Sequence, residues 1–282
     1  MIIGLNEALE YAEKNQCGLA AVNTPFFAAV LGTIEVGEAT GVPIILQFAQ
    51  VHDPIVGIEN MGPAMVALAE RSEAPFVLHV DHGEDIDYIR KGLDMGFNSC
   101  MFDGSHHSFD DNVRLTREVV EMAHDRGIGV EGEIGMMTGN ENGDPSQGEA
   151  DETLYTDADE AAAFVEATGI DCLAASFGTV HGMYHKEPHL NLDLITRLRE
   201  RTGVPIVMHG GSGLSDDDYR NATQRGVRKI NYYTYAAKAA LDAARPLAED
   251  PEVLLWPTLA MAARDAVRED VMRFVKVLAN KN

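Results

Sequence analysis

The sequence predicts a single (β/α)8 barrel, or TIM barrel, with additional C-terminal helices. Short apolar, β-branched runs alternate with longer amphipathic stretches along most of the 282 residues. Eight such runs, each followed by a helical stretch, are the pattern of a closed parallel barrel. The length also lies within the range of one α/β-barrel domain with an extension. We therefore predict one domain over residues 1–282, with a helical extension over about residues 235–282.

The strands and helices are assigned in chain order from this alternation. The predicted strands cover residues 18–22, 43–48, 75–80, 99–102, 127–133, 171–176, 205–208 and 227–230. The helices that lie between them include residues 85–95, 110–125, 158–168, 192–201 and 216–225. Ser108, with Asp111 three positions later, predicts a capping box at the start of one helix.

Three segments lie outside the repeating pattern. Residues 1–16 have the pattern of an amphipathic helix, without the basic start and apolar stretch of a signal peptide. Residues 235–282 are almost wholly helical in pattern, with prolines as breaks. Residues 136–154 are glycine-rich and acidic, have no apolar period and are longer than most barrel connections, which predicts a mobile loop on the rim.

The composition excludes several classes of partner. The formal charge is −23, from 22 Lys and Arg against 45 Asp and Glu, so neither nucleic acid nor an anionic membrane is an expected partner. No apolar run reaches membrane-spanning length. Cys17, Cys100 and Cys172 are far apart and form no paired spacing, which argues against a disulfide framework and favours the cytoplasm. A phosphate site in so acidic a protein must work through local backbone donors and a metal.

A set of polar side chains falls at the C-terminal ends of the predicted strands, the face on which barrels build active sites. Asp81 and His82 are expected to follow the third strand, and His209 to end the seventh. The full set is Asp81, His82, Asp103, Glu133, His181, His209 and Asn231. Three imidazoles and a carboxylate at one barrel mouth match the ligands of a catalytic zinc ion. The other histidines, His52 among them, are interpreted as loop, cap or surface residues.

A glycine-rich segment follows the seventh predicted strand. It reads His209-Gly210-Gly211-Ser212-Gly213 and precedes a helix expected to begin near Ser215. Glycines let the backbone approach an anion, and amides at the start of a helix favour negative charge. In barrels the loops after strands seven and eight commonly bind phosphate. The segment is therefore a candidate phosphate site, although most such runs are only flexible turns.

Eight ordered segments carry a family resemblance. They are Ala21-Val22-Asn23, Leu78-His79-Val80-Asp81-His82, Met101-Phe102-Asp103-Gly104-Ser105-His106, Val130-Glu131-Gly132-Glu133-Ile134-Gly135, Gly139-Asn140-Glu141, Thr179-Val180-His181-Gly182-Met183-Tyr184, His209-Gly210-Gly211-Ser212-Gly213 and Lys229-Ile230-Asn231. From about Ala21 to Thr234 the chain resembles the class II fructose- and tagatose-bisphosphate aldolase family. The resemblance implies a zinc-dependent lyase that reversibly splits a phosphorylated ketose between its third and fourth carbons.

The resemblance also implies a role for each matching residue. His82, His181 and His209 are the implied zinc ligands, Glu133 is a further ligand or alternate-site partner, and Asp103 with Glu133 is a candidate second metal position. Asp81 is the implied proton shuttle at the fourth carbon, Glu141 the acid/base at the third carbon, and Asn231 the residue that holds the enediolate. The implied substrate-binding residues are Asn23, Gly182, Gly210, Gly211, Ser212 and Thr234. All of these except Asn23 are implied to line the site for the 1-phosphate, often with Na⁺ or K⁺ nearby. The resemblance further implies a homodimer or homotetramer.

Several positions depart from the family pattern. Where this chain reads Tyr232-Tyr233-Thr234-Tyr235, relatives have small or acidic residues. Many relatives have a basic residue at the position of Ala237, often a lysine at the position of His185, and often a serine at the position of Ala49. Those positions mostly serve phosphates, some of them the one at the far end of the substrate. We hypothesise that the acceptor aldehyde is not ordinary glyceraldehyde 3-phosphate, or that its phosphate is held differently. The alternative is neutral drift, with Lys186 and Lys238 compensating.

Other functions are weighed against the aldolase. A non-catalytic sugar-phosphate-binding relative would be expected to have lost Asp81, a zinc histidine or Glu141, and all are present. A metal-dependent hydrolase on the same barrel is a third interpretation, because fold alone does not fix chemistry. Without the family match, Glu141 would be interpreted as a solvated loop acid. The sequence leaves the sugar's stereochemistry, the resting metal and the oligomeric state open.

Overall fold

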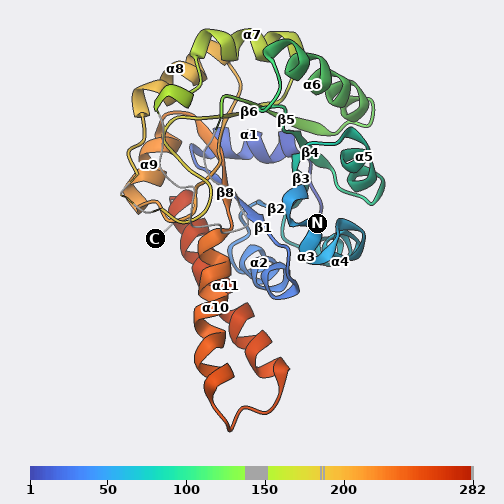
Figure 1. Cartoon of the computed structure of the whole chain (residues 1–282), viewed down its shortest axis with the longest axis vertical. Helices are drawn as coiled ribbons and strands as arrows, with labels where there is room; N and C mark the ends of the chain where they lie inside the picture. The colour runs from blue at the N-terminus through green and yellow to red at the C-terminus, as the bar shows by residue number, and fades with distance from the viewer. Residues whose placement is uncertain (137–151, 185, 187, 281–282) are drawn as a thin grey trace.

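The computed structural model describes residues 1–136, 152–184, 186 and 188–280. Within these residues, eight parallel strands close into a barrel in which each strand pairs with its neighbours in sequence and β8 pairs with β1. Helices surround the barrel (Figure 1). The predicted (β/α)8 fold with additional C-terminal helices is confirmed.

The strands lie within a few residues of their predicted positions. They are β1 (Leu19–Asn23), β2 (Ile44–Ala49), β3 (Phe76–Gly83), β4 (Ser99–Phe102), β5 (Gly129–Ile134), β6 (Cys172–Ala175), β7 (Ile206–Met208) and β8 (Val227–Tyr232). The largest difference is at β3, which continues to Gly83. Asp81 and His82 therefore lie inside the strand and do not follow it, and His209 directly follows β7 instead of ending it.

The helices also match the predicted stretches closely. They are α1 (Leu5–Asn15), α2 (Phe27–Thr40), α3 (Asp53–Val56), α4 (Ile58–Arg71), α5 (Ile86–Asp94), α6 (Phe109–His124), α7 (Ala158–Thr168), α8 (Leu192–Thr202), α9 (Asp216–Gln224), α10 (Thr234–Glu249) and α11 (Trp256–Leu278), with short 3₁₀ turns η1 (Gln50–His52) and η2 (Glu152–Leu154). The Ser108 hydroxyl caps α6 by accepting from the Asp111 amide, as predicted. The reciprocal capping box is instead at α9, between Ser215 and Asp218.

The apolar core explains why the polar side chains gather at one end of the barrel. Strand residues are buried on both faces of the sheet, as in parallel barrels generally. The helix α1 lies across the barrel in Figure 1, and its Leu5 and Leu9 pack in one buried cluster with Ile45, Val77 and Val207. This cluster fills one end of the barrel with hydrocarbon. The polar groups are left to the opposite, C-terminal end.

The C-terminal helices α10 and α11 form a hairpin that projects beyond the barrel (Figure 1). The helix α11 packs on α2 and α10, with Val267 beside Gly32 of α2, and its Phe274 stacks on Tyr232 of β8. Gly32 permits the close approach of α2, because a Cβ atom there would lie 2.9 Å from the Arg264 carbonyl oxygen. At the far end of the hairpin, Leu254, Leu255 and Trp256 are 83%, 68% and 73% exposed.

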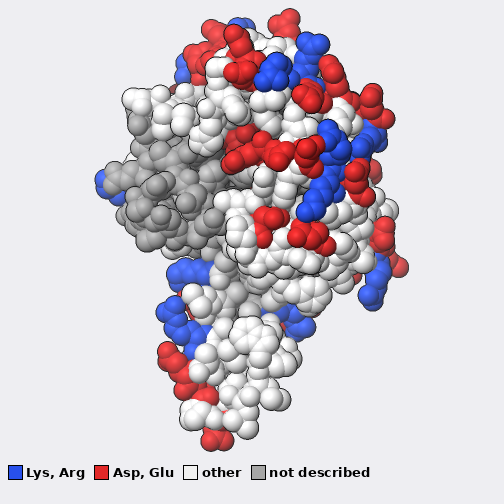
Figure 2. Space-filling view, turned by 45° about the vertical axis from the view of Figure 1, so that its right-hand side comes forward, with Lys and Arg blue, Asp and Glu red and all other residues white. Residues whose placement is uncertain are grey.

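The surface reflects the excess of acids. Figure 2 shows carboxylates over much of the visible barrel, with arginines and lysines between them, whereas the visible face of the hairpin is mostly uncharged. None of the helices in the described part of the chain is both long and apolar enough to cross a membrane. The three cysteines are buried and form no disulfide with one another.

Candidate active site

A bulge in β3 brings two adjacent side chains into one site. Neighbouring residues in a regular strand point to opposite faces of the sheet. Here the pairing of β3 with β4 shifts between Val80 and Gly83, and His82 has a φ of +44°. Such a φ in a residue other than glycine costs of order 1–3 kcal/mol, and bulges re-aim side chains next to active sites. As a result both Asp81 and His82 contact groups at the barrel mouth, which residue spacing alone did not predict.

The three predicted zinc histidines meet at this mouth. Each offers a ring nitrogen, and these nitrogens all lie within 4.8 Å of one another. The centroid of the His82 ring is 4.5 Å from that of His209 and 5.1 Å from that of His181. His209 is fully buried, and burial followed by the charge of His82 lowers the pKa values of His181 and His209. Neutral imidazoles are the form that binds metal.

Two carboxylates determine which nitrogen of each ring carries its proton. Asp103 Oδ2 lies 2.7 Å from His82 Nδ1, and Glu131 Oε1 lies 2.7 Å from His209 Nε2. Since a carboxylate only accepts, these nitrogens carry hydrogen, and His82 Nε2 and His209 Nδ1 are the nitrogens left to bind a metal. They are 2.9 Å apart, and in the metal-free protein a hydrogen on His82 Nε2 bridges them. Ligating histidines are commonly oriented by carboxylates in this way, so the donor set fits a zinc ion.

Glu133 and Asp103 form a second group with His82. One ligand atom from each lies within 4.8 Å of the others, which makes this group compatible with the predicted second metal position. Burial, followed by the charge of Asp103, raises the pKa of Glu133 well above its usual value. Asn112 donates to the Glu133 carbonyl oxygen at 2.9 Å and so fixes the backbone there. A neutral Glu133 must lose a proton before it can bind a cation.

Asp81 is held by three amide side chains. Its Oδ2 accepts from Asn23 Nδ2 at 2.8 Å and from Gln47 Nε2 at 2.9 Å, and Asn231 Nδ2 lies 3.2 Å from its Oδ1. Burial opposes ionisation, but the charges of His82 and Lys229 outweigh it and hold the pKa of Asp81 well below its usual range. Asp81 is therefore an ionised, oriented base. Gln47 has no counterpart in the sequence prediction, where it was one polar residue in an apolar strand.

The glycine-rich loop is fixed against its neighbours. Gly210 has a φ of +62°, and a Cβ atom there would lie 2.3 Å from the Val180 carbonyl oxygen. The Tyr184 hydroxyl donates to the Gly210 carbonyl oxygen at 2.8 Å. The Gly211 amide donates to the Asn231 carbonyl oxygen at 3.1 Å, so this amide is already engaged within the protein.

Three further predicted positions, Ser212, Thr234 and Gly182, lie in this loop or in segments next to the site. The Ser212 hydroxyl accepts from the Tyr233 amide at 2.9 Å, which joins the loop to the end of β8. Thr234 is the first residue of α10, and Gly182 has a φ of +92° next to His181. The predicted phosphate-binding residues Ser212 and Thr234 are thus adjacent, because Tyr233 directly precedes Thr234 in the chain.

An aromatic pair lies between the ends of β2 and β8. His52 was interpreted from the sequence as a loop, cap or surface residue. It lies in the turn η1 between β2 and α3, but its side chain is fully buried, so it is not a surface residue. Its ring centroid is 4.4 Å from that of Tyr233 and 6.5 Å from that of Phe48. Tyr233 is one of the positions at which the sequence departs from the family pattern.

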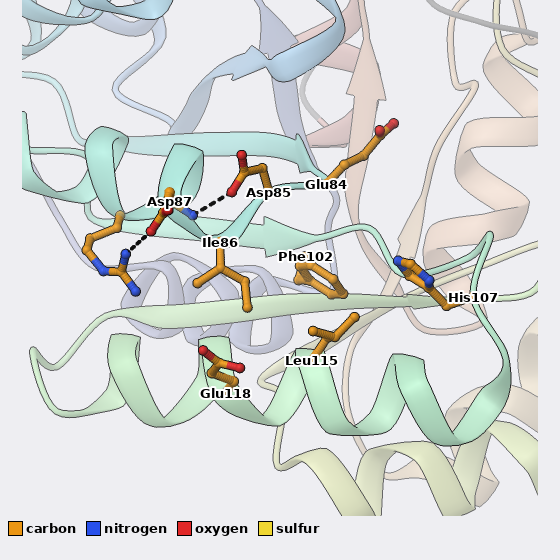
Figure 3. A pocket seen from close by; sticks show the side chains of 9 residues that line it. Glu84, Asp85, Ile86, Asp87, Phe102, His107, Leu115 and Glu118 are labelled. Atoms are coloured by element: carbon orange, nitrogen blue, oxygen red, sulfur yellow. Dashed lines mark hydrogen bonds and ion pairs between the residues drawn. The ribbon is translucent and has the colours of Figure 1, made fainter.

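A surface cavity of about 470 Å³ lies near the mouth but outside it. Figure 3 shows it between α5 and α6, with Glu84, His107 and Glu118 around an apolar floor that includes Phe102. The residues predicted for the active site do not line it. We therefore do not assign substrate to this cavity. The predicted acid/base Glu141 and most of the predicted rim loop lie outside the described residues.

Sequence comparison agrees with this geometry. The sequence model of the family described as fructose-bisphosphate aldolase class-II matches residues 3–282. The chain belongs to this class II aldolase family. The resemblance found from the eight segments is confirmed, and the family places the protein among the lyases.

Individual class II aldolases show how closely it is related. The fructose-bisphosphate aldolase of Geobacillus stearothermophilus is 40% identical over 199 residues, which cover 70% of this chain and 68% of that protein. The 6-phospho-5-dehydro-2-deoxy-D-gluconate aldolase of Halalkalibacterium halodurans is 32% identical over 96% of this chain and 93% of its own. The crystal structure of the YdjI aldolase from Escherichia coli K12 superimposes with a TM-score of 0.87 at 32% identity, over 99% of this chain and 97% of that one. The names of these relatives differ in substrate, so family membership alone does not determine it.

Proposed function

We propose that this protein catalyses the zinc-dependent, reversible retro-aldol cleavage of a ketose 1-phosphate or 1,6-bisphosphate of the fructose or tagatose type. The products are dihydroxyacetone phosphate and an aldehyde such as glyceraldehyde 3-phosphate. The main support is the convergence of His82, His181 and His209 within 4.8 Å beside a buried carboxylate. Zinc held by these residues supplies a Lewis acid that stabilises negative charge on substrate oxygens. Asp103 and Glu133 are the proposed second divalent position.

Asp81 is the proposed proton shuttle. Its low pKa keeps it ionised, and its three amide donors aim it at the barrel mouth. It takes the proton of the hydroxyl on the fourth carbon during cleavage and returns it to the aldehyde oxygen during condensation. Such acid–base assistance contributes typically ~10²–10⁴-fold to rate. Asn231, which contacts Asp81, is proposed to hold the dihydroxyacetone phosphate half, and Glu141 is the proposed acid/base at the third carbon.

The 1-phosphate is proposed to bind between the glycine-rich loop and the start of α10. Gly182, Gly210, Gly211, Ser212 and Thr234 form this proposed site, and Asn23 completes the substrate contacts. Backbone amides at a helix start favour an anion, which suits a protein whose overall charge repels one. Because the Gly211 amide already bonds to Asn231, the binding amides are those of its neighbours in the loop and of the first turn of α10. A Na⁺ or K⁺ ion nearby remains part of the proposal.

We propose that the part of the protein that binds the aldehyde half of the substrate has no ordinary site for a terminal phosphate. The contact between His52 and Tyr233 supports this, because it brings two tilted rings together at Tyr233, a family position for small or acidic residues. Ala49, at the end of β2, has no hydroxyl to offer in place of serine. An aromatic wall suits an uncharged aldehyde better than a phosphate.

A substrate panel with the zinc-loaded protein tests this function. The panel contains fructose 1,6-bisphosphate, tagatose 1,6-bisphosphate, 6-phospho-5-dehydro-2-deoxy-D-gluconate and a ketose 1-phosphate without a terminal phosphate. Release of dihydroxyacetone phosphate is measured with and without prior metal stripping. We expect cleavage that depends on zinc and is highest for the 1-phosphate. A clear preference for fructose bisphosphate would reject the acceptor proposal, and full activity after metal stripping would reject the zinc lyase itself.

The assembly and location are proposed on separate grounds. We propose a homodimer or homotetramer in which a second copy covers the apolar end of the α10–α11 hairpin, because Leu254, Leu255 and Trp256 are largely exposed there. The visible face of the hairpin is also mostly uncharged (Figure 2). We propose a cytoplasmic protein whose partners are small sugar phosphates, with neither nucleic acid nor membrane bound.

A further inference from the structure

The barrel layer directly below the site is polar. In parallel barrels, branched apolar residues usually fill the interior layers. Here His79, Glu131 and Lys229 each stand two positions before a residue of the site on the same strand, namely Asp81, Glu133 and Asn231. Side chains two apart share a face of the sheet, so all three point inward. All three are fully buried, which is rare for charged residues unless they are paired.

Lys229 joins the two halves of this layer. Its ammonium nitrogen lies 2.8 Å from Glu131 Oε2 and 2.7 Å from Asn231 Oδ1. It is also 3.9 Å from Asp81 Oδ1. None of the steps of the proposed cleavage uses this lysine, and its complete burial leaves it out of reach of substrate.

The contact with Asn231 selects one orientation of an amide. An asparagine side chain offers an acceptor oxygen and a donor nitrogen. Because Lys229 donates to Oδ1, Nδ2 is turned toward the Asp81 carboxylate. The opposite orientation would point donor hydrogens at an ammonium group and the amide oxygen at a carboxylate. Lys229 thus favours the orientation in which Asn231 presents its NH₂ group at the barrel mouth.

The contact with Glu131 acts on a proposed metal ligand. One oxygen of Glu131 forms an ion pair with Lys229, and the other accepts from His209 Nε2. This second bond keeps the lone pair of His209 on Nδ1, which faces His82. Without the lysine, Glu131 would be a buried carboxylate that has lost its neighbouring positive charge. The strength and geometry of its hydrogen bond with His209 would change as a result.

We propose that Lys229 is a positioning residue that sets, through Asn231 and Glu131, the orientation of a substrate-binding amide and of a zinc-binding imidazole. This proposal rests on the proposed function. The competing interpretation is that Lys229 and Glu131 form an ion pair that only stabilises the barrel.

The double variant Glu131→Gln/Lys229→Met separates the two interpretations. Each single variant leaves one buried charge without its partner and is expected to lower the melting temperature, whereas the double variant removes both charges and should recover most of it. For a positioning role we expect the recovered double variant to bind zinc about 10–100-fold more weakly and to show a similar loss in kcat. A double variant that binds zinc and turns over like the parent would overturn the proposal. Lys276→Met, at an exposed position on α11, is the matched control and should change neither quantity.

A second measurement uses the unaltered sequence and does not depend on whether the variants fold. Nitrogen-15 NMR of labelled histidines in the metal-free protein at pH 8 reports which ring nitrogen of His209 carries hydrogen. We expect the Nε2–H form, and finding hydrogen on Nδ1 would overturn the proposal. If the parent protein neither bound zinc nor cleaved a ketose phosphate, the proposed function would fail, whereas this NMR result would still test whether the buried layer orients the His209 ring.

Discussion

The Nε2 atom of His82 lies 2.9 Å from the Nδ1 atom of His209, although 127 residues separate them in the chain. The opposite nitrogen of each ring is bonded to a carboxylate, Asp103 for His82 and Glu131 for His209. In the metal-free protein a hydrogen on His82 Nε2 therefore bridges the two facing nitrogens. A divalent cation bound by both nitrogens and by His181 would take the place of that hydrogen. The arrangement predicts how the protein responds to changes in each of these groups.

Removing one imidazole should remove the zinc site. In His209→Ala we expect zinc affinity to fall by at least about 100-fold, beyond the 10–100-fold typical of losing an outer partner of a ligand. Competition with a chromophoric chelator measures it. His124→Ala, at a histidine on the outer helix α6 that pairs with Asp171, is the control and should bind zinc like the parent. Parent-like affinity in the His209 variant would contradict the predicted ligand set.

Replacing Asp81 should separate proton transfer from metal binding. Asp81→Asn is expected to lower kcat by about 10²–10⁴-fold, since the amide cannot take the hydroxyl proton. Zinc affinity should stay close to that of the parent, because Asp81 is not a proposed ligand. Steady-state kinetics and metal titration measure the two effects, with Asp125→Asn at an exposed position as control. A kcat within a few-fold of the parent's would exclude Asp81 as the shuttle.

Glu133 should release a proton when metal binds. Burial and the charge of Asp103 raise the pKa of Glu133 and favour its protonated, neutral form, whereas the lowered pKa values of His181 and His209 favour neutral rings. Binding at pH 7 therefore takes no proton from these two imidazoles but about one from Glu133 if it is a ligand. Calorimetry in buffers of different ionisation enthalpy counts the protons released. The count should drop by about one in Glu133→Gln, and an unchanged count would remove Glu133 from the ligand set.

The end of the α10–α11 hairpin should control assembly. Replacing Leu254, Leu255 and Trp256 together by serine is expected to shift the protein toward smaller species, because their exposed apolar surface would no longer be covered by a second copy. Sedimentation velocity measures the shift. Ile55→Ser removes an exposed apolar side chain elsewhere, on α3, and should leave the mass unchanged. An assembly identical to the parent's after the triple change would show that the hairpin end is not the interface.

Much of the fold and of the candidate site could be predicted from local patterns. Apolar runs and capping residues located the strands and helices, because periodicity and capping depend on near neighbours in the chain. The same runs placed His82, His181 and His209 at one barrel mouth, since the C-terminal ends of parallel strands meet at one edge. The buried positions of Glu131 and Lys229 could also have been predicted. Each is a charged residue inside an apolar strand and stands two positions before a candidate site residue, Glu133 or Asn231.

The sequence by itself therefore determined the barrel, the family and the set of candidate site residues. Only the tertiary structure decided their directions and partners. The bulge at His82 turns two adjacent side chains into one site, and the carboxylates of Asp103 and Glu131 select the ring nitrogens that face each other. These features depend on contacts between strands distant in sequence. The physical reason is that hydrogen-bond geometry and backbone strain are fixed only when the barrel closes.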